Sequence, residues 1–195
     1  MAKSASKKSW REYMWIVSAM YITLGFFNIL FGWLGLICFF VPLIISIVSG
    51  TKTYCNVYCG RGQLMQILGD KLKLSRYRDI PPWLRSKKFR YGFLAFFMTM
   101  FFNMIFVTVL VFAGSRNLEQ VVTLLWTFDV PWHWAHTVNV SAGVAQFAFG
   151  FYSIMVTSAL MGVVTAILYK PRSWCVYCPM GTMTQGICVL KHKDK

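Results

Sequence analysis

The 195-residue chain has the composition of a membrane protein rather than of a soluble domain. Hydrophobic residues make up 57% of it and charged residues only 13%, whereas a soluble domain carries about 25% charged residues. The net charge of +14 arises from twenty Lys and Arg residues against six Asp and Glu residues. So few carboxylates, together with the lack of a phosphate-binding loop or a dinucleotide fingerprint, argue against hydrolytic and nucleotide-dependent enzymes and leave redox chemistry.

The first long apolar region predicts a membrane hairpin. Residues 13–50 contain no Asp, Glu, Lys, Arg or His. As a single helix they would run about 57 Å, nearly twice the roughly 30 Å thickness of the hydrocarbon layer. We therefore predict two spans, at about 13–31 and 35–51, joined by a turn near Gly32–Gly35.

A pair of cysteines follows this hairpin directly. Cys55 and Cys59 have three residues between them, and the sequence continues as Gly60, Arg61 and Gly62. Two thiols at this spacing lie on one side of a turn. A structural disulfide is not expected in the reducing cytoplasm, so a pair of metal or cluster ligands is the better interpretation.

The basic residues predict the orientation of the chain. The third span is predicted at about 91–113 and the fourth within 138–169. Arg116 is the one Lys or Arg residue between those two spans, and the other nineteen fall on the opposite side. By the positive-inside rule that side is cytoplasmic. We therefore predict a multi-pass protein of the inner (cytoplasmic) membrane, with both termini and both cysteine motifs at the cytoplasmic face.

Ten of the basic residues lie between the second and third predicted spans. This charge favours attraction to the anionic lipids of the membrane. The basic segment 71–90 has too few residues to build a separate nucleic-acid-binding fold, so we expect no nucleic-acid partner.

The segment between the third and fourth spans combines apolar and polar residues. Leu118, Val121, Val122 and Leu125 recur at helical spacing and predict a short helix lying flat on the outer surface. Further along stand Trp and His residues and an aspartate, namely Trp126, Asp129, Trp132, His133, Trp134 and His136. They fit an interfacial aromatic belt, or a site where His133 and His136, together with Asp129, manage protons.

A second cysteine motif follows the fourth span. Cys175 and Cys178 have two residues between them, and Pro179, Gly181 and Gln185 come next. From the second cysteine onward the spacing to Gly and then Gln matches that of the first motif. The chain thus repeats itself, and we predict a single membrane domain, 1–195, with an internal pseudo-repeat of 1–85 and 86–195.

This repeat predicts the fold class. We expect an all-α integral membrane protein, a four-helix bundle built from two hairpins that run in the same direction. A pseudo-two-fold axis along the membrane normal would bring both cysteine motifs together at the cytoplasmic face, as in other membrane proteins built from parallel repeats.

Four thiols brought together in this way predict a metal centre. The four candidate ligands are Cys55, Cys59, Cys175 and Cys178. Four-cysteine sites hold either zinc or iron–sulfur clusters. Cys38 lies inside the second span and is interpreted as a core thiol, and Cys188 as a bystander.

The residues around the thiols favour a cluster over zinc. A Cys-Pro pair, as at Cys178, is common in ferredoxin-type loops, and Pro179 suits the first position of a helix. Helices starting near Gly62 and Gly181 would direct their amide groups toward an anionic cluster, which basic side chains would also stabilise. The candidates for that role are Arg61, Lys170 and Arg172.

The pattern of hairpin, cysteine motif, hairpin and cysteine motif resembles the membrane iron–sulfur proteins of the NapH and NosR type, which are quinol dehydrogenase membrane components. The matching positions are Cys55, Cys59, Gly62, Cys175, Cys178, Pro179 and Gly181. The chain departs from the family pattern in having Gly60 in place of Pro, in the shorter second motif, and in having no ferredoxin-type cysteine run after it.

The resemblance implies an electron-transfer subunit with one [4Fe-4S] cluster that exchanges electrons between a membrane quinone and a partner redox protein. The partner would dock at the cytoplasmic face, with the segment 71–90 as a landing surface. Asn28, Asn103 and Gln146 are the polar groups within the spans, and they either contact a quinone or join helices by hydrogen bonds.

Two other functions remain open from the sequence. One is a non-catalytic membrane anchor or assembly subunit whose four-cysteine site holds structural zinc. The other is a transporter, but the methionines of the third span, Met98, Met100 and Met104, stand among phenylalanines and fit packing better. Catalytic residues are not identified, and an enzymatic role is expected only as a redox subunit of a quinol-linked complex.

Overall fold

The computed structural model of the chain describes residues 13–123, 127–129 and 140–193. Most of these residues are helical, and the strands among them form one antiparallel pair. The helices are α1 (Met14–Phe27), α2 (Gly35–Ser49), α3 (Gly60–Gln66), α4 (Pro82–Arg85), α5 (Lys87–Phe112), α6 (Ala142–Leu168) and α7 (Pro179–Lys193), and the strands are β1 (Val121–Thr123) and β2 (Thr127–Asp129).

Three helical segments among the described residues are long and apolar enough to cross a membrane. They are Ile29–Ser49, which joins a 3-10 turn to α2, and the helices α5 and α6. Helix α1 is apolar but has only 14 residues, or about 21 Å of helix, which is less than the hydrocarbon thickness. The composition and these helices are consistent with a membrane protein, and the first predicted span, 13–31, is shorter than expected.

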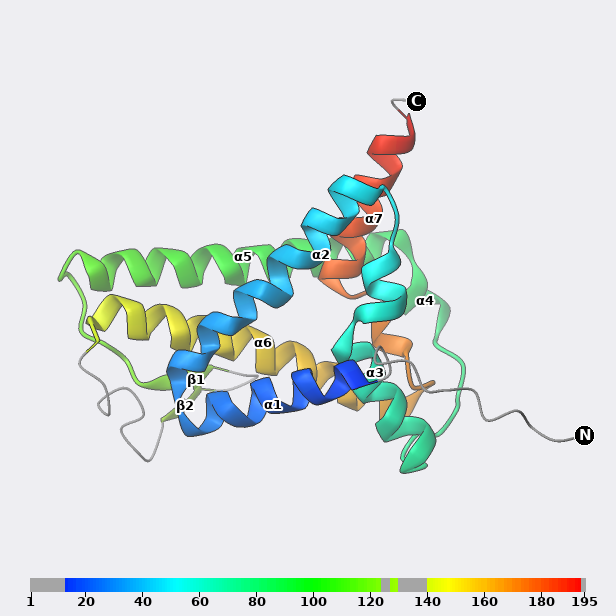
Figure 1. Cartoon of the computed structure of the whole chain (residues 1–195), viewed down its shortest axis with the longest axis horizontal. Coiled ribbons are helices and arrows are strands. Elements are labelled where there is room, and N and C mark those ends of the chain that lie inside the picture. The colour runs from blue at the N-terminus through cyan, green and yellow to red at the C-terminus, as the bar shows by residue number, and fades with distance from the viewer. Residues whose placement is uncertain (1–12, 124–126, 130–139, 194–195) are drawn as a thin grey trace, which may run out of the picture.

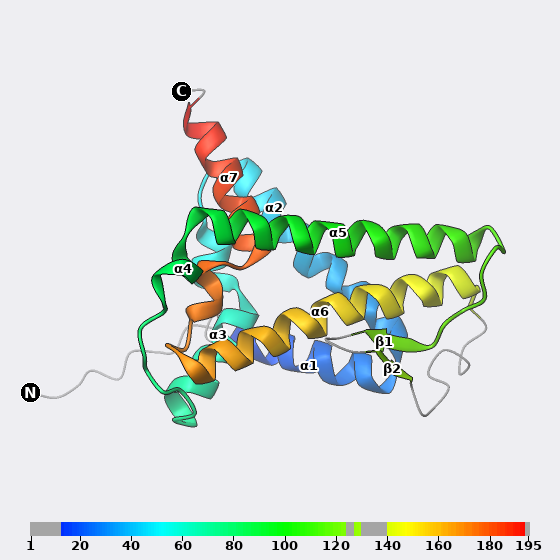
Figure 2. The ribbon, with the colours of Figure 1, turned by 180° about the vertical axis from the view of Figure 1, so that it is seen from behind.

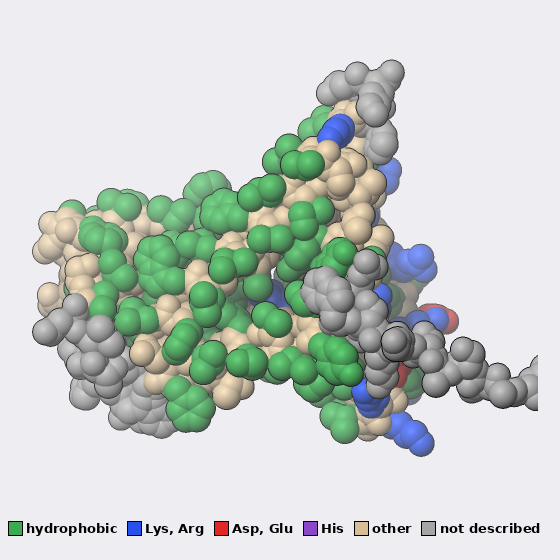
Figure 3. Space-filling view, viewed as in Figure 1, with side chains coloured by type: hydrophobic (Ala, Val, Ile, Leu, Met, Phe, Trp, Pro, Cys, Tyr) green, Lys and Arg blue, Asp and Glu red, His purple; other side chains and the backbone are tan. Residues whose placement is uncertain are grey.

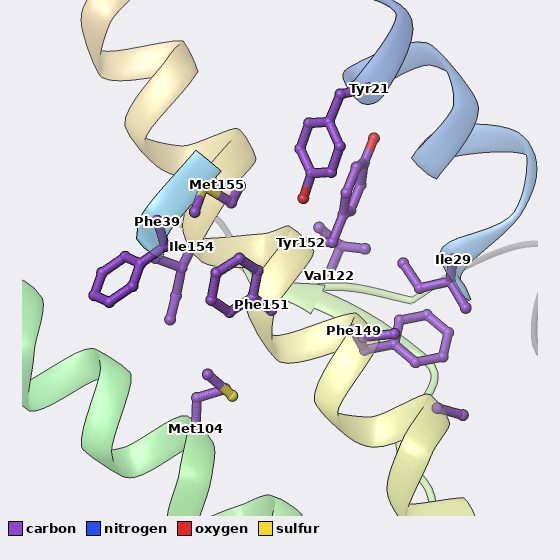
Figure 4. Packing of buried hydrophobic residues seen from close by; sticks show 12 residues of the cluster. Tyr21, Ile29, Phe39, Met104, Val122, Phe149, Phe151, Tyr152, Ile154 and Met155 are labelled. Carbon is purple, nitrogen blue, oxygen red and sulfur yellow. The ribbon is translucent and has the colours of Figure 1, made fainter. Parts of the chain in front are cut away.

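Helix α6 is the centre of the molecule. It lies between α5 and α1 (Figures 1 and 2), and Phe149, Phe151 and Tyr152 on it are almost completely buried. Figure 4 shows side chains from other elements around it, among them Tyr21 from α1, Phe39 from α2 and Met104 from α5. Helices α2 and α5 instead expose many apolar side chains, as expected of helices that face lipid.

The predicted turn near Gly32–Gly35 is a 3-10 segment, Ile29–Leu34. The side chain of Asn28 accepts a hydrogen bond from the Leu30 amide at 3.0 Å and so caps this segment. Beyond the turn, α2 does not return along α1 but crosses the molecule obliquely and packs against α7 (Figure 1).

The outer segment is extended where the sequence analysis predicted a helix. Val121–Thr123 pairs antiparallel with Thr127–Asp129, so the predicted helix over Leu118–Leu125 is wrong. Its β-branched residues favour a strand, and the strand docks on α6 through a hydrogen bond from the Thr123 amide to Ser153 Oγ at 3.1 Å. The fold class is therefore mostly helical with one strand pair, rather than all-α.

The two ends of the molecule differ in charge. Figure 3 shows one face of the molecule. Hydrophobic side chains cover most of this face, and basic side chains gather at the end that carries α3 and α7. Helix α2 ends there at Gly50, which adopts a left-handed conformation (φ 65°) that favours glycine. Lys191 of α7 donates to the carbonyl groups of Ile47 and Val48, each at 2.7 Å, and so ties α7 to the last turn of α2.

Candidate metal centre

The four motif cysteines line one cavity at the basic end. Cys55 lies in a π-helical turn, Tyr54–Tyr58, and Cys59 directly precedes α3. Cys175 lies in a 3-10 turn and Cys178 directly precedes α7. The cavity has a volume of about 100 Å³, whereas one water needs roughly 10–15 Å³ by the same measure. There is thus room for a group of several atoms between the two motifs.

The second cysteine of each motif stands at the beginning of a helix. The Cys59 carbonyl accepts from the Gln63 amide at 3.1 Å, and the Cys178 carbonyl accepts from the Thr182 amide at 2.9 Å. Pro179 occupies the first position of α7, as predicted. Helix α3 begins at Gly60, two residues before the expected start near Gly62. The N-terminal residues of both helices line the cavity, so their amides favour an anion there.

Two glycines of the motifs lie close to Cys175. A Cβ atom on Gly62 would lie 3.6 Å from Sγ of Cys175, so the first motif packs directly on a thiol of the second. A Cβ atom on Gly181 would lie 3.6 Å from the Cys175 carbonyl oxygen. Both glycines predicted for the site therefore border Cys175.

Gly60 stands where the NapH and NosR type proteins, which this chain resembles, have proline. The structure leaves no space for a side chain at this position. A Cβ atom on Gly60 would overlap the Met14 carbonyl oxygen and lie 2.6 Å from Ser18 Oγ. Helix α3 thus begins against the backbone of α1, where no side chain fits.

Arg61 brings a positive charge into the cavity wall. Its guanidinium donates to Ser158 Oγ at 2.6 Å and to the Met155 sulfur, both on α6. The ion pairs within the described part of the chain are Arg116–Glu119 and Lys170–Asp79, so Arg61 has no carboxylate partner there. A half-buried cation held only by neutral groups favours an anion in the cavity.

The other two predicted basic residues lie differently. Arg172 donates to the carbonyl groups of Cys55 and Asn56, each at 3.4 Å, and to the Cys175 thiol. It therefore joins the two motifs at the surface. Lys170 pairs with Asp79 in an exposed position and does not line the cavity.

The protein around the cavity alters the acidity of its thiols. Burial raises the pKa of Cys178 to about 12, although the Gly181 amide donates to its sulfur and acts in the opposite direction. Burial also raises the pKa of Cys55, against a hydrogen bond with Thr184 Oγ1 at 3.6 Å, and of Cys175. The Cys175 side chain opens to the cavity, but protein atoms surround it on most sides, so desolvation dominates. Metal binding would have to displace these protons.

Apolar side chains and a fifth thiol also line the cavity. Phe39, Pro42 and Phe97 line it together with methionines of α6 and α7. Cys38 of α2 lines it as well, although sequence analysis interpreted it as a core thiol. No motif surrounds Cys38, and only the oblique path of α2 brings it to the site.

The remaining polar candidates lie elsewhere. Cys188 is buried in α7 outside the cavity lining. Gln146 accepts from the Glu119 amide at 3.1 Å and so fixes the outer segment to α6, while Asn103 is exposed on α5. Asn28 caps the 3-10 turn, which leaves none of the three amides in the cavity wall. The positions of Trp126, Trp132, His133, Trp134 and His136, and the side chain of Asp129, lie outside what the structure describes.

The spacing of the thiols bears on the kind of metal group. Across the described residues, no three Cys, His, Asp or Glu side chains are grouped closely enough to hold a single metal ion. Zinc requires its sulfur ligands about 2.3 Å from one point. A [4Fe-4S] cluster is held by four thiolates, each bound to a different iron, and so accepts thiols spread around a larger space. The four cysteines, the cavity volume and Arg61 all fit such a cluster.

Comparison with known protein families agrees with this geometry. The family described as "4Fe-4S binding domain" matches residues 31–90 and 153–195, two stretches that each contain one cysteine motif and together cover more than half of the chain. Searches of curated proteins and of solved structures give no match. The chain belongs to the 4Fe-4S binding domain family and is an iron–sulfur protein.

Proposed function

We propose that this protein is a membrane electron-transfer subunit of the NapH and NosR type, with one [4Fe-4S] cluster held by Cys55, Cys59, Cys175 and Cys178. The observation that carries the proposal is that thiols from two motifs more than a hundred residues apart line one cavity. A bound cluster of this kind supplies one-electron transfer.

Arg61 supports the proposal from the side of charge. A cluster with four thiolate ligands is anionic, and the guanidinium of Arg61 has no carboxylate partner within the described residues. The N-terminal amides of α7 add a second source of positive potential, since the Gly181 amide already donates to Cys178. The positive charge of Arg61 and the amides of α7 therefore favour an anionic group in the cavity.

The apolar side of the cavity supports a membrane quinone as the electron-exchange partner. Phe39, Phe97 and Met155 face the same space as the thiols, and they come from helices α2, α5 and α6. A quinone ring entering between these helices would reach the cluster edge without crossing the bilayer. The cytoplasmic redox partner would then dock on the basic segment 71–90, through its exposed side chains Lys71, Lys73, Arg76, Arg78, Arg85, Lys87 and Lys88. Both termini and both motifs lie at the cytoplasmic face in this proposal, as the positive-inside rule requires.

Iron and acid-labile sulfide analysis of anaerobically purified protein tests the cluster. We expect about four of each per chain, a brown colour and bleaching by dithionite. Cys55→Ser and Cys178→Ser should each abolish the cluster, whereas Cys188→Ser, a buried thiol outside the cavity, is the matched control and should keep it. A colourless protein with stoichiometric zinc would instead establish the anchor or assembly role.

The same preparation tests the fifth thiol and the quinone. Cys38→Ser should retain the cluster, because the two motifs already supply four ligands; loss of iron in this variant would overturn the ligand assignment. Addition of a quinol under argon should bleach the oxidised cluster of the native protein. An unchanged spectrum with quinols over a range of potentials would contradict the quinone part of the proposal.

A further inference from the structure

Two basic side chains converge where α2, α5 and α7 meet. Lys52 follows α2, and Arg90 lies in the first turn of α5. Both donate to the side-chain oxygen of Gln185 on α7, Lys52 Nζ at 2.8 Å and the Arg90 guanidinium at 2.5 Å. The two cationic nitrogens thus share one acceptor and lie close together. Figures 1 and 2 show the three elements side by side at this end of the molecule.

No negative charge balances this pair within the described part of the chain. The ion pairs there involve other residues, and Gln185 offers only one neutral oxygen to two cations. Nε of Arg90 is buried without a hydrogen-bond acceptor. Burial, with the neighbouring Arg90 charge, lowers the pKa of Lys52. Two like charges held together by one neutral acceptor are suited to an anion with several oxygens.

The surroundings indicate where such an anion would come from. Both α2 and α7 expose large apolar side chains near this junction, and Val48 is 74% exposed and Leu190 65% exposed. Apolar surface of this extent next to a cation pair fits the boundary between acyl chains and headgroups. A free anion would use the charges but leave the apolar surface uncovered.

We propose that Lys52, Arg90 and Gln185 form a binding site for the phosphate of an anionic phospholipid in the cytoplasmic leaflet. The two free phosphate oxygens accept from Lys52 Nζ and from the terminal nitrogens of the Arg90 guanidinium, while Gln185 keeps the two cations in place. The acyl chains cover the exposed faces of α2 and α7. The proposal rests on the membrane placement proposed above but not on the cluster.

Native mass spectrometry of the detergent-solubilised protein, titrated with phosphatidylglycerol or with phosphatidylcholine, tests this site. The variant with Lys52→Gln and Arg90→Gln is compared with a control carrying Lys87→Gln and Lys88→Gln, two exposed lysines beside Arg90. Both variants lose two charges, so general attraction to an anionic lipid falls equally. We expect the site variant to bind phosphatidylglycerol about tenfold more weakly than the control, because it also loses charge-assisted hydrogen bonds.

The remaining arms separate the proposal from its alternatives. Phosphatidylcholine binding should be equal in both variants, and inorganic phosphate should not displace phosphatidylglycerol. Equal weakening in the two variants, or displacement by inorganic phosphate, would overturn the lipid site. If the double variant does not fold, Lys52→Gln alone must still bind more weakly than Lys87→Gln. Iron content measured in the same samples reports on the proposed function separately.

Discussion

The two cysteine motifs have a similar local structure but different surroundings. In both, the second cysteine precedes a helix whose first amides lie beside the cavity. The first motif is pressed against the backbone of α1 and has Gly60 after its second cysteine, whereas the second motif has room for Pro179. In the first motif, packing against α1 therefore leaves no room for a side chain at the position after the second cysteine.

The largest expected effect comes from making the first motif like the second. Gly60→Pro should lower both the iron content and the thermal stability, because its side-chain atoms overlap the Met14 carbonyl oxygen and force α3 away from α1. Gly60→Ala brings only the Cβ atom and should cost about 1–3 kcal/mol, as other overpacked sites do. Iron analysis and thermal unfolding of the purified variants measure both effects.

Gly186→Ala is the matched control for that pair. Gly186 lies in α7, and a Cβ atom there would meet nothing within 4 Å. The substitution should keep the cluster and leave stability unchanged or slightly higher, since alanine favours helix more than glycine does. If Gly60→Ala and Gly186→Ala behave alike, α3 does not pack against α1 as described.

A second comparison separates the two arginines at the site. Arg61 lines the cavity without a carboxylate partner in the described chain, whereas Arg172 joins the motifs mainly through backbone carbonyl groups. Removing a cation near the cluster should make its reduction less favourable by about 1–2 kcal/mol, which for a one-electron couple is roughly 40–90 mV. Arg61→Gln should therefore lower the midpoint potential, measured by redox titration, while iron content stays near normal.

Arg172→Gln should show the opposite pattern. Its contacts hold the first motif to Cys175, so the variant should lose iron more readily to a chelator and change the midpoint potential less. Equal potentials in the native protein and Arg61→Gln would mean that Arg61 serves packing through Ser158 and Met155 rather than the charge of the cluster.

The same site marks how far sequence reasoning reaches. Spacing alone was enough to predict two thiol pairs, the helix that begins at Pro179 and a basic residue at Arg61, because these features are local. The sequence does not predict Cys38 at the cavity, because its position there depends on the oblique path of α2. It also does not predict that Ser158 contacts Arg61. Both depend on contacts between helices far apart in the sequence.

The predicted helix in the outer segment is wrong for a related reason. The apolar spacing of Val121 and Val122 predicts one face of a helix. Both residues are β-branched, however, and Val122 is buried against α6 in an extended strand. The predicted first span, 13–31, is also longer than helix α1. Composition does not show that the α-helix ends before Asn28, whose side chain caps a 3-10 turn.

The smallest expected effect completes the comparison of the motifs. Pro179→Gly makes the second motif like the first without creating an overlap, but it removes a ring that is buried in the cavity wall. The greater freedom of the unfolded chain costs about 0.4–1 kcal/mol, and the lost burial of the ring adds to this cost. Iron content should be that of the native protein. If Pro179→Gly loses its iron while Gly60→Ala keeps it, the residue after the cysteine acts through the helix start itself, and packing is not what distinguishes the two motifs.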